Sequence, residues 1–459
     1  MHLVDDSESQ PIASEAELVG YFHGAGKPAA RWRVGSEHEL IGVVAGGPEL
    51  GAAPAYDGPA GIGALMAFFA TRGWAPVREA AGGADAPIIA LTRGDAQITL
   101  EPGGQFELAA APVDDDRQFA DDLAAHVATL AEASRELGLA WLATGVRPEG
   151  ELASIPWMPK QRYAVMRAYM PGVGTRGLDM MQRTATVQTN LDYADEADAA
   201  AKMRGLMSVT SILTALWASS PIVGGVDTGR QSHRAWIWRD TDRARAGLLP
   251  LAFEGDDLFE RYTAWALDVP MYFVYRGGYQ PAGGITFRQF LRQGFRDHHA
   301  THADWALHLS TLFPEARLKR FIEVRGCDCG SLGMIAALGP MARGLLYDAT
   351  ALAEATALTA GLSAHERETL ADVVPERGLA TPVGRHTVGD LARELVAIAA
   401  DGLGRIAPAS RGLLAPVEAI ATSGRTQADE LRDAWHAAGD DRRARLRALA
   451  HPELAPTLG

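Results

Sequence analysis

Two carboxylates stand close together in the stretch GSEHELIGVV, residues 35–44. Alternate residues of a β-strand point to the same face, so Glu37 and Glu39 share one face while His38 and Leu40 share the other. Two like charges about 4 Å apart repel by about 4 kcal/mol at an intermediate effective dielectric. The pair therefore predicts a cation that lies between the two side chains.

Polar side chains also share one face in three further segments, QITLEPGGQFELAA, RTATVQTNLDY and KRFIEVRG. Their polar faces carry Glu101 and Glu107, Gln188, and Glu323 with Arg325. Carboxylate and amide oxygens are the ligands that Mg²⁺ prefers, and arginine binds phosphate through paired hydrogen bonds. Strand alternation does not fix whether Glu101 turns inward with Glu107. The four segments together indicate an oxygen-rich metal site beside a phosphate-binding arginine.

A plainer interpretation remains open at this point, because any antiparallel sheet with one solvated face shows the same alternation. Other familiar sites are missing from the sequence, which has no G-x-x-x-x-G-K-[ST] loop, no G-x-S-x-G elbow and no H-E-x-x-H motif. The cluster CDC at residues 327–329 is too short to hold zinc alone, which favours a structural or incidental role over a redox or ligand role.

Composition limits the class of protein. The 459 residues include 43 Lys and Arg against 57 Asp and Glu, and the resulting net charge of −14 opposes binding to nucleic acid. Only Cys327 and Cys329 occur, too close in sequence for a disulfide, and this favours the reducing cytoplasm. We expect no disulfide-controlled activity. The N-terminus resembles neither a signal nor a transit peptide, and no apolar run of about 20 residues predicts a membrane span.

The coarse organisation follows from periodicity. Residues 1–18 form a polar leader, and Ser14 is a candidate N-cap for a helix that begins near Glu15. Helical spacing of apolar residues predicts helices over 114–139 and 196–218, and the strand-like segments lie between and around them. From residue 351 to 459 the chain becomes Ala- and Leu-rich, which predicts a helical C-terminal region packed on the core formed by residues 19–350.

Several long stretches resemble plant-type glutamate-cysteine ligase, the form that plants share with many bacteria. The resemblance covers roughly residues 18 to 437 and rests on GSEHEL, ITLEPGGQFELAAAPV, MPKQRYAVMRAYMPGVGTRGLDMMQRTATVQTNLDY, WRDTDRARAGLLP, ALDVPMYFVYR, TFRQFL, HLSTLFPEARLKRFIEVRG and SGRTQADELRDAW. It implies an α+β, glutamine-synthetase-like funnel, in which a curved, mainly antiparallel sheet encloses the substrates and helices lie outside.

The resemblance also implies a reaction. The family uses ATP and Mg²⁺ to join the γ-carboxylate of L-glutamate to the amine of L-cysteine through γ-glutamyl phosphate, which gives γ-glutamylcysteine, the first intermediate of glutathione synthesis. Alternatives are a ligase that uses a different amine in a specialised pathway and a catalytically silent regulatory relative. The partners expected are these small molecules, with no nucleic acid and no membrane, and the oligomeric state is open.

Site residues follow from matching motifs. The resemblance implies a metal set of Glu37, Glu39, Glu101, Glu107, Gln188 and Glu323. It also implies that Arg325 stabilises the transferred phosphate, with Glu323 beside it as the other catalytic residue. By the same resemblance, we expect Arg234 to bind the glutamate carboxylate and Tyr272 to line the cysteine site. Lys160 and Arg162 approach the nucleotide phosphates, although a solvated face explains these two residues equally well.

Overall fold

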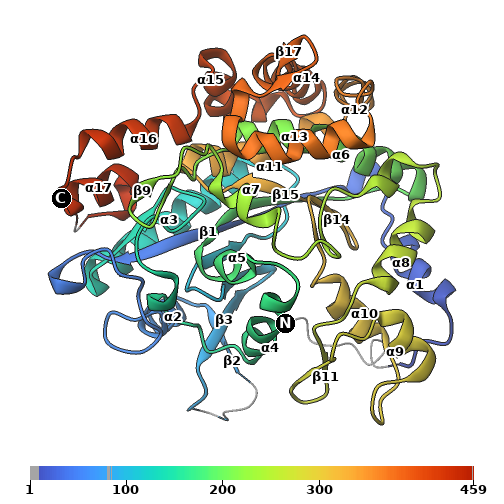
Figure 1. Ribbon diagram of the computed structural model, residues 1–459, viewed down its shortest axis with the longest axis horizontal. Coiled ribbons are helices and arrows are strands. Elements are labelled where there is room, and N and C mark those ends of the chain that lie inside the picture. Colours follow the sequence, from blue (N-terminus) through green and yellow to red (C-terminus); the bar gives the residue numbers. More distant parts are fainter. Residues whose placement is uncertain (1–9, 80–82, 84, 457, 459) are drawn as a thin grey trace.

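The computed structural model describes residues 10–79, 83, 85–456 and 458. Its centre is a nine-stranded sheet in the order β14-β15-β7-β1-β5-β4-β3-β2, with β6 also paired to β1 (Figure 1). Every neighbouring pair in this sheet is antiparallel, as the sequence predicts. The strands are β1 Val34–Val44, β2 Ala75–Arg78, β3 Ile88–Arg93, β4 Ala96–Leu100, β5 Phe106–Ala109, β6 Leu139–Leu142, β7 Thr186–Leu191, β14 Ala316–Leu318 and β15 Ile322–Asp328.

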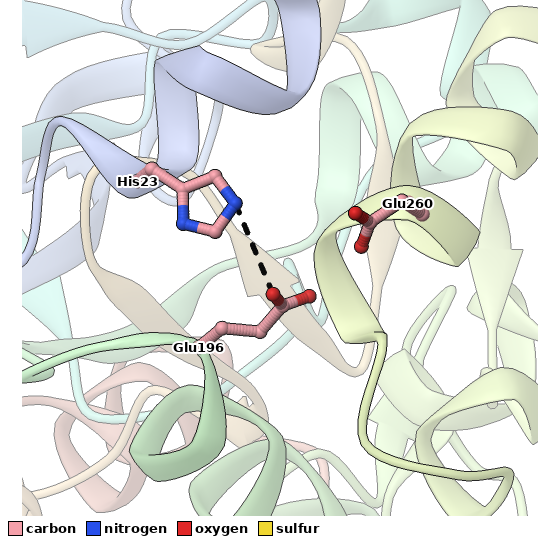
Figure 2. A group of neighbouring side chains, drawn as sticks. All are labelled: His23, Glu196 and Glu260. Carbon is pink, nitrogen blue, oxygen red and sulfur yellow. Dashed lines mark ion pairs between the residues drawn. The ribbon is translucent and has the colours of Figure 1, made fainter. Parts of the chain in front are cut away.

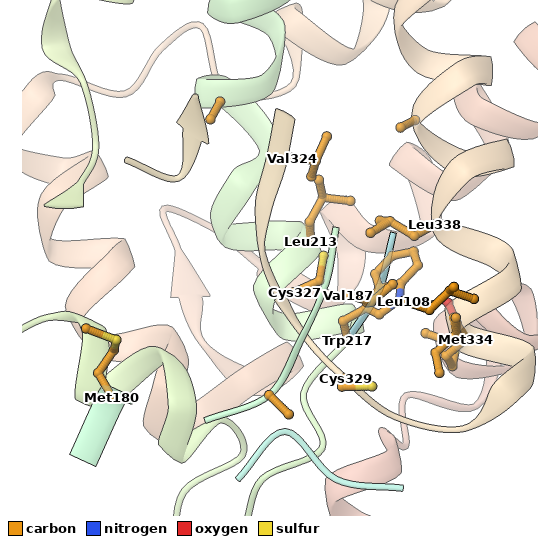
Figure 3. Packing of buried hydrophobic residues seen from close by; sticks show 14 of the residues in the cluster. Leu108, Met180, Val187, Leu213, Trp217, Val324, Cys327, Cys329, Met334 and Leu338 are labelled. Atoms are coloured by element: carbon orange, nitrogen blue, oxygen red, sulfur yellow. Dashed lines mark hydrogen bonds between the residues drawn. The ribbon is translucent and has the colours of Figure 1, made fainter. Parts of the chain in front are cut away.

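One face of this sheet is apolar and is covered by helices. Figure 3 shows Val187 of β7 and Val324 of β15 packed with Trp217, at the end of α6 Glu196–Leu216, and with Leu338 of α11 Leu332–Leu346. Leu108 of β5 belongs to the same cluster. A third helix, α3 Asp116–Leu137, contacts both α11 and β6. Because the apolar residues of each strand face these helices, the polar residues of the same strands face the other way.

The predicted helices are present. The structure has α3 where 114–139 was predicted and α6 where 196–218 was predicted. Asp115 caps α3 by accepting a hydrogen bond from the backbone nitrogen of Arg117. The capping side chain of α6 is Asp195, which accepts from the backbone nitrogen of Asp198 at 2.9 Å. Polar residues directly before apolar periodicity therefore mark both helix starts.

The N-terminal helix α1 Glu15–His23 begins at the predicted residue, although the Ser14 side chain makes no capping bond. This helix extends past residue 18, where the predicted polar leader ends. Leu18 and Phe22 lie on its buried face and pack in the core, which holds the helix against the protein. Residues 1–9 of that leader lie outside the described residues. The division of the chain at residue 18 stays a prediction.

The remaining elements surround the sheet. The helices before the C-terminal region are α2 Ile62–Ala70, α4 Gln161–Tyr169, α5 Gly177–Arg183, α7 His233–Trp238, α8 Leu258–Asp268, α9 Phe287–Gln293 and α10 His302–Leu309. Short strand pairs are β8 Ile222–Val223 with β9 Val226–Asp227, β10 Ala246–Gly247 with β13 Phe313–Pro314, β11 Phe273–Tyr275 with β12 Tyr279–Pro281, and β16 Pro382–Val383 with β17 His386–Thr387. No helix in the described ranges is long and apolar enough to cross a membrane.

The C-terminal region is helical and lies along one side of the molecule, coloured orange to red in Figure 1. Its helices are α12 Ala349–Ala357, α13 Ala364–Arg377, α14 Val388–Ile406, α15 Ala415–Ser423, α16 Gln427–Ala437 and α17 Arg442–Leu449. α14 packs on α11, while α12 and α13 pack on α6. α13 also contacts α7, the helix that carries Arg234. Whether residues 351–459 form a separate domain stays a prediction.

Candidate active site

The polar face of the sheet brings the predicted carboxylates together. Across β1 and its neighbours, Glu39 lies opposite Glu107 of β5, and Glu37 lies opposite Gln188 of β7. One strand further, Glu323 of β15 lies opposite Asn190. Strand pairing thus aligns residues that are far apart in sequence into one row, as the alternation predicted.

Three carboxylates in this row repel one another. Burial and the charges of Glu323 and Glu107 raise the pKa of Glu37 to about 6. Burial, with Glu101 next, raises the pKa of Glu107 to about 7, and burial with Glu101 and Glu107 raises the pKa of Glu39 well above its ordinary value. Each effect has the sign expected of charges that lack a compensating cation.

Hydrogen-bond donors of the protein compensate the negative charge of these carboxylates only in part. Asn190 Nδ2 donates to Glu37 Oε1 at 2.7 Å, and the backbone nitrogen of Thr186 donates to Glu39 Oε2 at 3.0 Å. The Thr99 hydroxyl donates to Glu107. The donors are all neutral, and the free oxygens form a set of hard ligands, so the residues present fit Mg²⁺.

Glu101 follows β4, and its backbone closes the turn before β5, where the Gly104 nitrogen donates to the Glu101 oxygen at 2.9 Å. Its carboxylate raises the pKa of both Glu39 and Glu107, so it lies on the side of the predicted metal ligands. In the described part of the chain, the carboxylates of this row are not among the groups of three or more ligand atoms that approach within 4.8 Å.

Glu323 differs from the other carboxylates because three cations surround it. Arg317 Nη2 lies 2.7 Å from Glu323 Oε1, Lys319 Nζ lies 3.3 Å from Oε2, and Arg325 Nη1 also contacts Oε1. Burial alone would raise the pKa of Glu323, but the charges of Arg317, Lys319 and Arg325 hold it well below the ordinary value. Glu323 is therefore ionised and already paired.

Arg317 and Lys319 were missed by the sequence analysis. The segment RLKRFIEVRG could have indicated both residues, because it carries several cations close to Glu323. In the structure β14 folds back on β15 and places Arg317 opposite Glu323. Arg325, by contrast, is where the sequence predicted it. Its Nη1 also donates a hydrogen bond to Gln188 Oε1 at 2.6 Å. Arg325 therefore contacts two members of the carboxylate row, Glu323 and Gln188.

Arg234 lies in α7 and is only 4% exposed. Its Nη2 donates to the backbone oxygen of Arg325 at 3.0 Å, and its Nη1 lies 3.9 Å from Asp328 Oδ1. Asp328 is fully buried and accepts hydrogen bonds from the hydroxyls of Ser220 and Ser232 at 2.6 and 2.7 Å. This network fixes the start of α7, and Asp328 is a third residue that the sequence analysis did not identify.

The C-terminal region supports the same segment. The backbone oxygen of Pro375 in α13 accepts from the backbone nitrogens of Gln231 and Ser232 at 2.9 and 3.0 Å. The Gln231 side chain donates to Asp429 and accepts from Thr426, each at 2.7 Å. The residues directly before Arg234 are therefore held by helices more than 130 residues further along the chain.

A small pocket lies where α7 meets β13 and the end of β15, and it is lined by Arg234, Trp238, Phe313, Glu315 and Arg325 among others. Tyr272 is 2% exposed and packs near Phe313, with 6.5 Å between ring centroids. The guanidinium of the fully buried Arg245 lies over the Tyr272 ring at 3.8 Å. Tyr272 is thus next to the pocket wall and is not itself a lining residue.

Lys160 directly precedes α4 and Arg162 lies in its first turn. Lys160 Nζ donates to the Leu100 oxygen at 2.7 Å, and burial lowers its pKa while the nearby charges of Glu101 and Glu107 act in the opposite direction. Lys160 also lines a second, larger cleft of about 680 Å³ together with Trp157 and Arg167. The Arg162 guanidinium lies over the Phe273 ring at 5.6 Å and does not line that cleft.

Both cysteines are free and buried. Cys327 pairs with Val187 after a β-bulge between Val324 and Cys327, and the bulge moves Cys327 to the apolar face shown in Figure 3. Burial raises the pKa of both thiols far above the ordinary value. Neither thiol is suited to act as a nucleophile.

A separate group of potential ligands occurs where α1, α6 and α8 meet. Figure 2 shows His23, Glu196 and Glu260, whose ligand atoms lie within 4.8 Å of one another, and His23 Nε2 lies 3.8 Å from Glu196 Oε2. Glu196 accepts from the backbone nitrogen of Phe259 at 2.7 Å. Both glutamates are in the first turns of their helices, where helix dipoles favour acids, so helix capping explains this group.

Comparison with known proteins shows the family to which the chain belongs. The profile of the family described as Glutamate-cysteine ligase family 2(GCS2) matches residues 33–449. The chain is 40% identical over 433 residues to the chloroplastic glutamate-cysteine ligase of Nicotiana tabacum, covering 93% of this chain and 81% of that protein. It is 39% identical over 428 residues to chloroplastic glutamate-cysteine ligase A of Oryza sativa subsp. japonica, covering 92% and 85%.

Among solved structures, the fold matches that of Glutamate-Cysteine Ligase (gshA) from Francisella tularensis in complex with AMP, with a TM-score of 0.53 at 12% identity. The match covers 93% of this chain and 91% of that one. This likeness shows the fold alone, and it confirms the predicted glutamine-synthetase-like architecture. By the extent of the profile match and of the identity to its relatives, the chain belongs to glutamate-cysteine ligase family 2.

Proposed function

We propose that the protein joins L-glutamate to L-cysteine with ATP and Mg²⁺ and so makes γ-glutamylcysteine. The observation that carries this function is the row of buried, mutually repelling carboxylates beside Arg325, in a chain that belongs to glutamate-cysteine ligase family 2. The relatives from tobacco and rice bear the name of this activity, and the Francisella structure holds AMP, which supports an adenine nucleotide as substrate.

The chemistry requires activation of a carboxylate. A carboxylate does not acylate an amine at neutral pH because its leaving group is too poor, so ATP first phosphorylates the γ-carboxylate. The cysteine amine then attacks γ-glutamyl phosphate and phosphate leaves. Bound Mg²⁺ supplies neutralisation of the phosphate charge.

In this proposal, the chain's own residues position the metal and the phosphate and neutralise the phosphate charge. We assign Glu37, Glu39, Glu101, Glu107 and Gln188 to the metal, because their oxygens share one face of the sheet and lack enough cations. Arg325 is held by Glu323 and Gln188 with its charge directed to this row, where it stabilises the phosphate as it transfers. Glu323 stays in the proposal as the partner that orients Arg325.

The remaining assignments complete the proposal. Arg234 binds the glutamate carboxylate, Tyr272 borders the cysteine site, and Lys160 and Arg162 face the nucleotide phosphates. Two free, buried thiols suit a reducing compartment, and we propose the cytoplasm. Another amine as acceptor is the second candidate, since no contact among the described residues identifies the amine that attacks.

The test is phosphate release from ATP with L-glutamate, measured with and without Mg²⁺, for L-cysteine and a panel of other amines, with the products identified by mass. We expect Mg²⁺-dependent turnover selective for cysteine and a product with the mass of γ-glutamylcysteine. Selectivity for another amine would move the protein to a different pathway. Absence of glutamate-dependent turnover with every amine would overturn the proposal.

A further inference from the structure

Two buried arginines lie opposite each other where the segment after β6 meets the segment before β7. Val146 forms an antiparallel bridge with Thr184, and the backbone nitrogen of Arg147 donates to the backbone oxygen of Arg183 at 2.8 Å. The register of this bridge places the Arg147 and Arg183 side chains on the same face. Arg147 is 1% exposed and Arg183 is 5% exposed. Like charges opposite each other on paired strands are unfavourable, and more so where water is excluded.

The charge of Arg147 has no acidic partner. In the described chain its guanidinium forms no ion pair, and its hydrogen bond runs from Nη1 to the backbone oxygen of Gly42 at 2.9 Å. Burial, followed by the charge of Arg183, lowers the pKa of Arg147 to about 9, so the side chain stays charged at neutral pH. A fully buried charge without a counterion is strongly unfavourable.

Three guanidinium nitrogens of this pair are left without partners. Arg147 Nε and Nη2 and Arg183 Nη1 are buried, and none has a hydrogen-bond partner in the part of the chain that the structure describes. The other nitrogens of Arg183 are used, since Nε lies 3.1 Å from Asp179 Oδ1 and Nη2 donates to the Gly150 oxygen at 2.9 Å. Buried donors are normally paired, so these three groups indicate an acceptor that the polypeptide does not supply.

The surroundings of the pair are positive as well. Burial, followed by the charges of Arg230, Arg176 and Arg183, lowers the pKa of the neighbouring His233 to about 4. Its Nδ1 is also buried without a partner in the described chain. Within the same residues, Asp179 is the single acid in an ion pair with either buried arginine. Two guanidiniums and one carboxylate leave a net charge of +1, which one monovalent anion balances.

We infer that Arg147 and Arg183 bind a small monovalent anion of the halide class. Its donors are Arg147 Nε and Nη2 on one side and Arg183 Nη1 on the other. The anion is small because both guanidiniums are almost completely enclosed. Arg147 also holds β1 through Gly42, and Arg183 shortly precedes β7, so the anion stabilises the junction of β1, β6 and β7 as a structural ligand.

The test is a chloride titration of the full chain at constant ionic strength, in which chloride replaces gluconate, an anion too large for a buried site. We expect the melting temperature of the wild type to rise by about 1 to 3 °C and then level off, because a ligand that binds only the folded state stabilises it by mass action. The absence of a saturable rise would overturn the inference.

Arg147→Met keeps a long side chain and removes both the charge and the unpaired donors. We expect this variant to lose the chloride response and, in gluconate alone, to melt no lower than the wild type, because an uncompensated buried charge is gone. Arg135→Met, at an exposed position of α3, is the matched control and should keep the wild-type response. The same saturable response in Arg147→Met would contradict the assignment of this site.

Anomalous diffraction from wild-type crystals soaked in bromide tests the site without any variant. We expect a bromide peak between the guanidiniums of Arg147 and Arg183. A water molecule in this place, with no bromide, would overturn the inference. A bromide peak without a saturable chloride response in solution would show an adventitious ion only, and it would overturn the inference too.

Discussion

The carboxylate row is unfavourable for the stability of the protein when no cation compensates its charge. Glu39 and Glu107 lie directly opposite each other on neighbouring strands, where like charges are unfavourable. Both have a raised pKa because burial and like charge disfavour ionisation. Active sites commonly keep such costly arrangements, since function requires them and the rest of the fold compensates.

The substitution Glu107→Gln separates the effect of this carboxylate on stability from its effect on activity. Because the amide keeps the shape and removes one charge, we expect the metal-free protein to gain up to about 1 kcal/mol in its free energy of unfolding. We also expect Mg²⁺-dependent phosphate release to fall at least tenfold, because a metal ligand is lost. Urea unfolding in EDTA and the phosphate assay measure the two quantities. Glu49→Gln, which is exposed, should change neither, and full activity in Glu107→Gln would remove Glu107 from the metal set.

At the scale of elements, the sequence predicts what depends on local periodicity. Alternation correctly placed Glu37, Glu39, Gln188 and Glu323 on polar faces, and helical spacing located α3 and α6. The role of Arg317 could not be predicted, because it depends on the register of β14 against β15. Neither the period of two residues of a strand nor the period of 3.6 residues of a helix gives the register between two strands.

Asp328 shows a further reason for a missed residue. Simple alternation would place Cys327 on the same face as Glu323 and Arg325. The bulge between Val324 and Cys327 shifts the register by one residue, so Cys327 pairs with Val187 and faces the opposite side of the sheet. As a result Cys327 enters the core, and Asp328 turns toward Ser220 and Ser232. A bulge changes the face of every residue after it, so a pattern read without the partner strand fails there.

The contact between α11 and α14 yields a test of close packing. A Cβ atom at Gly402 would lie 2.2 Å from the backbone oxygen of Gly344, whereas one at Gly404, in the same helix, would meet nothing within 4 Å. We expect Gly402→Ala to lower the free energy of unfolding by about 1 to 3 kcal/mol through overpacking. We expect Gly404→Ala to raise it by about 0.5 to 1 kcal/mol, because alanine favours the helix.

Urea midpoints of the two alanine variants provide the measurement, and each variant serves as the control for the other. Equal midpoints for Gly402→Ala and Gly404→Ala would show that α11 and α14 do not approach as closely as the structure indicates. Because α14 supports α11 and α11 covers the sheet, we expect the destabilised variant to keep its KM values until it unfolds.

For the whole molecule, buried histidines determine how stability responds to acid. Burial lowers the pKa of His126, His308 and His451 to about 3 each. In the unfolded chain these histidines bind a proton near pH 6.5, whereas in the folded protein they stay neutral down to about pH 3. Burying a neutral histidine therefore contributes its full stability above pH 6.5, and the folded state loses stability as the pH falls toward 3. Each such histidine lowers the free energy of unfolding by about 1.4 kcal/mol per pH unit below 6.5.

His126→Phe isolates one of these contributions, because the ring of His126 stacks on Phe106 at an interplanar angle of 14° and an aromatic ring fits the site. We expect the difference in unfolding free energy between the variant and the wild type to shift in favour of the variant by about 1.4 kcal/mol from pH 6 to pH 5. His365→Phe, at an exposed position, is the control. A difference that stays constant with pH would contradict the prediction.

The support that Pro375, Thr426 and Asp429 give to the segment before Arg234 links the site to the order in which the chain is made. A ribosome synthesises the carboxylate row and Arg234 long before these helices, and early segments fold first where they can. The nascent chain therefore holds its ligands before it holds the groups that fix Arg234. The segment before Arg234 is therefore fixed only once nearly the entire polypeptide has been translated, and under the proposed function a nascent chain does not yet bind glutamate.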